Sequence, residues 1–316
     1  MAVPRKRILF VIMDGMGDRA CPELGGKTPL QAVDTPNIDW FVSNGNSGIM
    51  DVISPGIRPG SDTAHLSLLG YNAKEVYTGR GPFEAAGIGL IGKRGDVAFR
   101  CNFGTVDEDL NRRAGRIRAP DTTELVRSLS GMMIKGIEVT VKEGTEHRAA
   151  LLLRGPGLSS KVTDADPHEN ARILDSEPLV PDAALTAEVV NEFVRLSYER
   201  MKDHPVNKKR REAGLPEANI LLPRGAGSFP DIDPFPQVNG ISGACVAGVG
   251  MIKGICGVCG LDVIDLPPAC TGGSDTNMIL KTQIALETLE DHDFVLMNFK
   301  APDVCGHDMM YAKKMD

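Results

Sequence analysis

An apolar segment near the N-terminus, Arg7-Ile8-Leu9-Phe10-Val11-Ile12-Met13, is followed directly by Asp14-Gly15-Met16-Gly17-Asp18. A short apolar run that ends in turn residues is typical of a buried parallel β-strand. Open parallel sheets bind their ligands at the carboxyl ends of their strands. The segment therefore predicts an α/β fold with the carboxylate of Asp14 at the ligand-binding edge of a sheet.

Apolar segments rich in β-forming residues alternate with helical patterns along the chain, which favours the α/β class. We expect strands at 7–13, 47–53, 95–104, 136–142, 148–154, 218–222, 244–249, 260–265 and 293–299. We expect helices at 36–43, 61–69, 121–130, 182–203, 251–256 and 274–291, the last with an N-cap cluster at Ser274-Asp275-Thr276. The strand–turn patterns of 1–70 and 244–316 are alike, whereas the middle of the chain differs. This predicts a discontinuous core of residues 1–75 and 244–316, interrupted by an inserted domain of residues 76–243.

Composition excludes several classes of protein. The 316 residues are enough for two domains, and the formal charge of −7 argues against nucleic-acid binding, which usually leaves a basic surface. The apolar runs are shorter than the ~20 residues needed to span a bilayer, so no membrane association is expected. Seven cysteines, an odd number, do not suggest a disulfide framework and favour a reducing cytoplasm. The sequence leaves open whether the chain forms a homo-oligomer.

The segment Pro59-Gly60-Ser61-Asp62-Thr63-Ala64-His65 contains a candidate nucleophile. Gly60 permits a sharp turn, and Ser61 would begin a helix whose free backbone N–H groups favour a phosphate. A serine hydroxyl needs a base or a metal ion to become reactive. The alternative is that Ser61 or Asp62 only caps this helix.

Two further groups of residues could bind a metal ion or an anion. Asp303 and His307 are four residues apart, so on a helical turn they would share a face and suit Zn²⁺ or Mn²⁺, although this spacing is frequent by chance. Asp14 could equally be an ordinary Asp-Gly turn residue. The planar guanidinium groups of a short arginine-rich stretch could bind carboxylate or phosphate, or form a solvated basic loop; its members are Arg112, Arg113, Arg116 and Arg118. Arg224 and Lys253 are isolated cations at the ends of apolar runs.

Taken together, these segments resemble the cofactor-independent phosphoglycerate mutases, in particular their archaeal-type branch within the alkaline phosphatase superfamily. The resemblance covers essentially the whole chain and rests on segments 14–18, 59–65, 79–85, 96–103, 112–116 and 298–307. It implies an alkaline-phosphatase-like core with a mostly parallel sheet and helices on both faces, interrupted by a smaller inserted α/β domain. The implied reaction interconverts 3-phosphoglycerate and 2-phosphoglycerate through a phosphoserine, without 2,3-bisphosphoglycerate.

The resemblance also implies roles for individual residues. Ser61 would be the nucleophile and share one divalent metal ion with Asp14, and Asp303 and His307 would hold a second ion. Mn²⁺ is the first choice for both ions, and Zn²⁺, Co²⁺ or Mg²⁺ are alternatives. Lys253 would lie near the transferred phosphoryl group. The substrate clamp would consist of Arg112, Arg113, Arg116 and Arg224.

Members of this family carry an Asp-His pair and a further histidine beyond the position of Asp316. We therefore expect the ligands in this sequence, Asp14, Ser61, Asp303 and His307, to bind metal weakly, because metal affinity depends on ligand number. Two other functions fit the same residues: another metal-dependent phosphomutase or phosphohydrolase of the superfamily, or a catalytically inactive binding protein.

Overall fold

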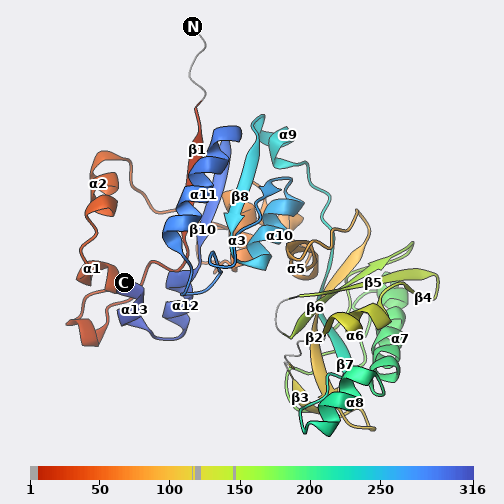
Figure 1. The fold of residues 1–316 in the computed structure, drawn as a ribbon. Helices are drawn as coiled ribbons and strands as arrows, with labels where there is room; N and C mark the ends of the chain where they lie inside the picture. The colour runs from red at the N-terminus through yellow and green to blue at the C-terminus, as the bar shows by residue number, and fades with distance from the viewer. Residues whose placement is uncertain (1–5, 116, 118–121, 145–146) are drawn as a thin grey trace. The chain divides into compact units, whose positions relative to one another are not determined.

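The computed structural model describes residues 6–115, 117, 122–144 and 147–316, and Figure 1 shows its helices and strands. The chain forms two compact units. One comprises residues 1–71 and 233–316 and is called the core unit here; the other, residues 72–232, is the inserted unit. Within the described part of the chain, no helix has the length and hydrophobicity required to cross a membrane.

The core unit is built on a parallel four-stranded sheet with the strand order β1–β10–β8–β9. Its strands are β1 (Ile8–Met13), β8 (Gly243–Ala247), β9 (Asp262–Val263) and β10 (Phe294–Phe299). Its helices are η1 (Pro22–Leu24), α1 (Pro29–Ala32), α2 (Pro36–Asn44), α3 (Ser61–Leu68), α9 (Phe235–Asn239), α10 (Gly250–Val258), α11 (Met278–Asp291), α12 (Ala301–His307) and α13 (Tyr311–Met315).

Helices cover both faces of this sheet, as the resemblance implied. Every residue of β10 is buried, which requires cover on both sides because alternate side chains of a strand point to opposite faces. Val295, Met297 and Phe299 pack with Ala285 of α11. On the other face, Asn298 contacts His65 of α3. The carboxyl end of β10 therefore lies between two layers of helices.

Strand β1 is parallel, as predicted, but it is not buried. It pairs with β10 along one side, while Ile8 and Val11 remain 49% and 44% exposed. In the described sheet it is consequently an edge strand. The predicted strand at 47–53 is wrong: these residues form an irregular loop in which Ile49 is fully exposed.

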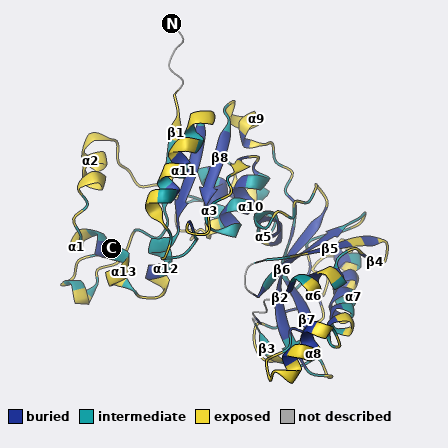
Figure 2. Cartoon of the chain, in the orientation of Figure 1, coloured by how far each residue is buried: buried dark blue, intermediate teal, exposed yellow. Residues whose placement is uncertain are grey.

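The inserted unit contains an entirely antiparallel sheet in the order β3–β2–β6–β5–β4, with β7 also paired to β2. Its strands are β2 (Val97–Val106), β3 (Arg112–Gly115), β4 (Met132–Ile134), β5 (Ile137–Glu143), β6 (Arg148–Arg154) and β7 (Ile220–Ser228). Its helices are α4 (Ala73–Val76), α5 (Gly81–Gly87), α6 (Thr122–Leu129), η2 (Pro181–Ala183), α7 (Ala184–Met201) and α8 (Pro205–Glu212). Figure 2 shows this sheet as mainly buried, with exposed residues on the helices and loops around it.

Alternation along β2 separates an apolar core from a polar face. Val97, Phe99, Cys101 and Phe103 are buried in the hydrophobic core with Leu125 of α6 and Phe193 of α7. The intervening positions, including Arg100 and Asn102, point to the opposite face. The strand thus serves both as a structural support and as a carrier of polar side chains.

The boundaries between the units lie at 71/72 and 232/233 rather than at the predicted 75/76 and 243/244. The second boundary lies earlier because α9 belongs to the core unit, where the Phe235 and Phe294 rings are 4.9 Å apart.

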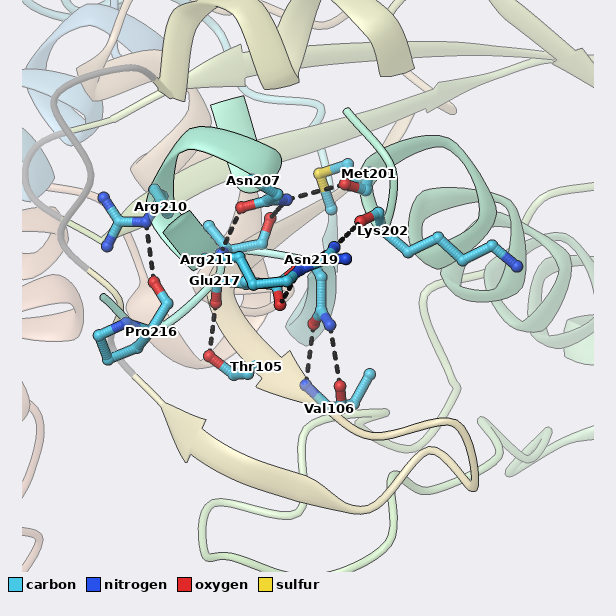
Figure 3. Close-up of polar contacts among 11 residues, drawn as sticks. Thr105, Val106, Met201, Lys202, Asn207, Arg210, Arg211, Pro216, Glu217 and Asn219 are labelled. Atoms are coloured by element: carbon cyan, nitrogen blue, oxygen red, sulfur yellow. Dashed lines mark hydrogen bonds and ion pairs between the residues drawn. The ribbon is translucent and has the colours of Figure 1, made fainter. Parts of the chain in front are cut away.

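Two buried asparagines of the inserted unit join backbone segments next to β7 (Figure 3): Asn207 connects the end of α7 to Ala218, and Asn219 connects the start of β7 to the end of β2. The Asn207 Nδ2 donates to the carbonyl oxygens of Met201 and Ala218, at 2.8 and 2.9 Å, and its Oδ1 accepts from Ala218 N at 2.9 Å. Asn219 pairs with both backbone groups of Val106 at 2.8 Å. Each side chain thereby substitutes for backbone pairing where the chain leaves regular structure.

Replacement of Asn207 by Ala should lower the free energy of unfolding by about 2–5 kcal/mol, because three hydrogen bonds to buried backbone groups are lost. Urea denaturation of the purified variant measures this change. Asn170→Ala is a suitable control, since Asn170 is exposed in the same unit. Equal stability of the two variants would contradict the structural role of Asn207.

Candidate active site

The register of the parallel sheet brings the ends of β1 and β10 together. Met13 is paired with Phe299, and the backbone N–H of Asp14 donates to the Phe299 carbonyl at 2.9 Å. Asp14 and Lys300 therefore leave the sheet side by side at its carboxyl edge. This is the edge at which the sequence predicted a ligand site.

Gly15 allows α12 to approach the end of β1 very closely. Its φ is +74°, and a Cβ atom at this position would lie only 2.4 Å from the Cα of Asp303. Only glycine combines this backbone conformation with so short an approach. The close contact fixes Asp303 beside Asp14, although the two residues are far apart in the sequence.

Ser61 is the first residue of α3, as predicted, but it does not cap the helix. The N-cap residue is Gly60, whose backbone N–H donates to Thr63 Oγ1 at 3.1 Å. Asp62 accepts a hydrogen bond from the backbone N–H of Thr63 at 2.9 Å. The exposed hydroxyl group of Ser61 is left to face Lys300, with its Oγ 3.3 Å from Nζ.

Lys300 lies at the centre of this group of residues, and sequence reasoning did not assign it a role. Its Nζ is 2.7 Å from Asp14 Oδ2 and 2.7 Å from Asp303 Oδ2. Burial alone would lower the pKa of Lys300, but hydrogen bonds and charge from the two carboxylates outweigh it and raise the pKa. No local sequence pattern marks Lys300, because its position beside Asp14 follows from the pairing of β10 with β1.

His65 connects the helix that carries Ser61 to the sheet. It is buried, and its Nδ1 lies 2.7 Å from the Ser61 carbonyl oxygen. Burial lowers the pKa of His65, so the ring is neutral at pH 7 and Nδ1–H donates this bond. Its Nε2 lies 3.5 Å from the Asn298 amide nitrogen of β10. The imidazole therefore helps to set the position of the first turn of α3.

The other predicted residues of the core unit lie close to this group or on neighbouring helices. His307 is four residues after Asp303 on α12, with its Nε2 3.7 Å from Asp303 Oδ2, and its side chain is 74% exposed. Lys253 lies in α10, which packs against α3. Burial is the main cause that lowers the pKa of Lys281, and the charge of Lys253 lowers it further.

The side chains at this edge carry oxygen atoms of the type that binds divalent cations. The described residues include no group of three His, Cys, Asp or Glu side chains that could hold a metal ion. However, oxygen atoms of Asp14, Asp303 and Ser61 converge on one positive centre, the Lys300 ammonium group. Carboxylate and hydroxyl oxygens are the ligands that Mg²⁺ and Mn²⁺ prefer. The donor types present thus suit divalent cations, with the imidazole of His307 close to Asp303.

The polar face of the inserted unit gathers arginines by strand register. Arg100 of β2 is opposite Arg224 of β7, and Asn102 of β2 is opposite Arg148 of β6. Directly opposed residues of antiparallel strands project to the same face. Burial, followed by the charge of Arg148, lowers the pKa of Arg100. The sequence analysis missed Arg100 and Arg148, although period-two alternation about Asn102 could have identified them.

A hollow of about 360 Å³ lies on this unit, and Asp166 is its most buried lining residue, at 1% exposure. The Asp166 carboxylate accepts hydrogen bonds from Arg112 Nη1 at 2.8 Å and from Asn102 Nδ2 at 2.9 Å. Arg224 Nη1 lies 3.9 Å from its second oxygen. Arg112 Nε and Asn102 Oδ1 are buried without a hydrogen-bond partner among the described residues, so the hollow offers polar groups to a ligand.

The two described members of the predicted arginine cluster, Arg112 and Arg113, point to different places. Arg112 and Arg224 line the hollow together, whereas Arg113 forms an ion pair with Asp107 and has a largely exposed side chain. Neighbouring strand residues point to opposite faces, which explains why Arg112 and Arg113 separate. Arg116 and Arg118 lie outside the described residues.

Comparison with known proteins identifies the family. The model of the 2,3-bisphosphoglycerate-independent phosphoglycerate mutase family matches residues 43–207. Proteins with that name from Methanopyrus kandleri and Methanosphaera stadtmanae are 51% and 52% identical; each match covers 96% of this chain, and 74% and 76% of the relative. This chain therefore belongs to the 2,3-bisphosphoglycerate-independent phosphoglycerate mutase family, a family of isomerases.

Solved structures agree with this assignment. A cofactor-independent phosphoglycerate mutase from Thermoplasma acidophilum is 39% identical with a TM-score of 0.74, and the match covers 98% of this chain and 82% of that one. A protein from Pyrococcus horikoshii is 36% identical with a TM-score of 0.82, and the match covers 99% of this chain and 75% of that one. The fold class predicted from the sequence is thus confirmed.

Replacement of Gly15 by Ala should lower the free energy of unfolding by at least about 1–3 kcal/mol, because the left-handed backbone becomes strained and the new methyl group meets Asp303. Thermal denaturation followed by circular dichroism measures the loss. Gly17→Ala is the matched control in the same loop, since a Cβ there has nothing within 4 Å and its φ is not left-handed. If both variants melt alike, the close approach of Gly15 to Asp303 is not a constraint on the fold.

Proposed function

We propose that this chain catalyses the 2,3-bisphosphoglycerate-independent interconversion of 3-phosphoglycerate and 2-phosphoglycerate, with Ser61 as the residue that carries the phosphoryl group. The single observation that carries the mechanism is the exposed Ser61 hydroxyl at a helix N-terminus, beside the Lys300 ammonium group that Asp14 and Asp303 also contact. The membership of the chain in the mutase family supports the substrate.

In the proposed reaction, Ser61 Oγ attacks the phosphorus of the bound phosphoglycerate. The Oγ–P bond forms while the bond from phosphorus to the glycerate oxygen breaks, and the proton lost by serine is balanced by one gained at that oxygen. The neighbouring glycerate hydroxyl then attacks the phosphoserine, which restores the serine hydroxyl. Free backbone N–H groups at the start of α3 are suited to the phosphoryl oxygens.

Asp14 and Ser61 would hold one divalent ion, and Asp303 and His307 would contribute to a second. Such ions, of which Mn²⁺ remains our first choice, supply positive charge that lowers the pKa of a bound hydroxyl. Lys253 is proposed as a further cation near the transferred group, and the location of α10 against α3 supports this.

The hollow of the inserted unit is the proposed clamp for the substrate. Arg112 and Arg224 can provide bidentate hydrogen bonds to carboxylate or phosphate, and Arg100 and Arg148 add positive charge to the same face. On a chain with a formal charge of −7, such a local basic face is what an anionic substrate requires. Arg113 and Arg116 stay predicted members of the clamp. The cytoplasmic location that the cysteines favour also stays a prediction.

Replacement of Ser61 by Ala should reduce mutase turnover by about a thousandfold or more, because no phosphoserine can form. The assay follows 2-phosphoglycerate formation from 3-phosphoglycerate with added Mn²⁺, and also inorganic phosphate, which a hydrolase would release. Ser67→Ala, in the same helix, is the control for effects on folding. Substantial mutase activity of the Ser61→Ala protein would exclude the phosphoserine route.

Replacement of Arg112 by Lys should raise the KM for phosphoglycerate about tenfold, since a point charge cannot reproduce a bidentate guanidinium. Steady-state kinetics of the variant measure this change. The control is Arg94→Lys, which alters an exposed arginine paired with Asp231. An unchanged KM would remove Arg112 from the clamp.

A further inference from the structure

The segment Gly79-Arg80-Gly81, which leads into α5, places an arginine directly on the sheet of the inserted unit. A Cβ atom at Gly79 would overlap the carbonyl oxygen of Ala226 in β7, and a Cβ atom at Gly81 would overlap that of Ala98 in β2. Gly79 also has a φ of +140°, which side chains disfavour. The two glycines therefore allow the backbone of Arg80 to lie against both strands.

One turn later on α5, Glu84 connects Arg80 to an arginine of the sheet. Its Oε1 lies 3.1 Å from Arg80 Nε and 3.7 Å from Arg100 Nη1. The side chains of Glu84 and Arg100 are 16% and 17% exposed, so water screens this pair weakly, whereas the Arg80 side chain is 51% exposed and accessible to a ligand. A single carboxylate oxygen thus contacts two guanidinium groups that would otherwise repel each other.

Arg80 also lies close to the arginines of the neighbouring strands. A Cβ atom at Gly225 would lie 3.8 Å from Arg80 Cβ, and Gly225 directly follows Arg224 in β7. Arg224 is in turn opposite Arg100 in the register of β2 and β7. The start of α5 therefore adds a guanidinium group to the polar face that carries Arg100, Arg148 and Arg224.

The positive charge on this face exceeds what Glu84 balances. In the part of the chain that the structure describes, Glu84 is the one carboxylate that forms an ion pair with Arg80 or Arg100. Burial is the main cause that lowers the pKa of Arg100, and the charges of neighbouring arginines, Arg148, Arg80 and Arg224, lower it further. A local excess of positive charge attracts anions, so this face favours an anionic ligand.

We infer that Arg80 is a further anion-binding residue of the proposed substrate clamp and that Glu84 is a positioning residue, which orients Arg80 and Arg100 toward the same anionic group. The inference rests on the proposed function for the identity of the ligand as phosphoglycerate. A guanidinium group binds carboxylate or phosphate through two parallel hydrogen bonds only in a fixed orientation. Because Glu84 contacts Nε of Arg80, the two terminal nitrogens of that arginine stay available for the anion.

The test is a calorimetric titration of 3-phosphoglycerate into the protein, with the same Mn²⁺ as in the turnover assay. Arg80→Met should raise the Kd about tenfold, because charge-assisted hydrogen bonds to the anion are lost. Arg127→Met is the matched control: Arg127 is an exposed arginine of α6, which packs on the other face of the sheet, and its replacement should leave the Kd unchanged.

The sign of the change distinguishes positioning by Glu84 from a simple charge effect. Removal of a carboxylate next to arginines would by itself make an anion bind more tightly. Glu84→Gln should instead raise the Kd about fivefold, and this effect should be smaller in the Arg80→Met background, since Glu84 acts through Arg80 and Arg100. Glu124→Gln, which alters an exposed carboxylate of α6, should not change the Kd.

An unchanged Kd of the Arg80→Met protein would overturn the inference, as would equal or tighter binding by Glu84→Gln. Because the Arg80 side chain is half-exposed, Arg80→Met should fold even if Glu84→Gln does not. Turnover separates this result from the proposed reaction. Mutase turnover of the wild type with an unchanged Kd of Arg80→Met would count against the inference alone, and the expected Kd changes without wild-type turnover would count against the mutase reaction alone.

Discussion

Parallel pairing of β1 with β10 is the constraint on which the proposed site depends. It aligns Met13 with Phe299, so the residues that follow these two strands emerge at the same sheet edge. Asp14 and Lys300, which are 286 positions apart, meet there at 2.7 Å. A slip of the register by one residue would turn each side chain to the other face and separate them.

Because Gly15 lies so close to Asp303, three segments meet at this edge: the turn after β1, the start of α12 and the start of α3. The turn after β1 packs its backbone directly on α12, and α3 presents Ser61 to the same point. Opposite charges then stabilise the arrangement, because the ammonium group of Lys300 is shared by two carboxylates at low exposure. The backbone geometry, more than any individual ion pair, determines which groups can meet.

The inserted unit concentrates positive charge on one face, although the chain as a whole is acidic. Period-two alternation directs the apolar residues of β2 into a core with α6 and α7 and directs Arg100 and Asn102 to the other face. Antiparallel pairing then adds Arg148 and Arg224 from neighbouring strands. Asp166 orients Arg112 at the hollow, which leaves the Arg112 Nε–H donor available for an anion.

Local pattern predicted the continuous apolar runs that form β1, β6 and β10 and the amphipathic helix α7, because these patterns extend over a whole element. It was wrong at 47–53, which forms an exposed loop instead of a strand. It also misplaced the start of α11, because the N-cap residue of this helix is Asn277 and not a residue of the 274–276 cluster. Lys300 was missed for a related reason: its role depends on which strand lies beside its own.

The sequence by itself determined the residue types of the site, the α/β class and the family, because motifs such as Pro59–His65 and Asn298–Asp303 carry them in chain order. Only the tertiary structure decided that Asp14, Ser61 and Asp303 surround one lysine, that Arg112 and Arg113 face apart, and that β1 lies at the edge of the described sheet. Local propensities act over a few residues, whereas strand order, register and close backbone packing join groups that the chain keeps hundreds of residues apart.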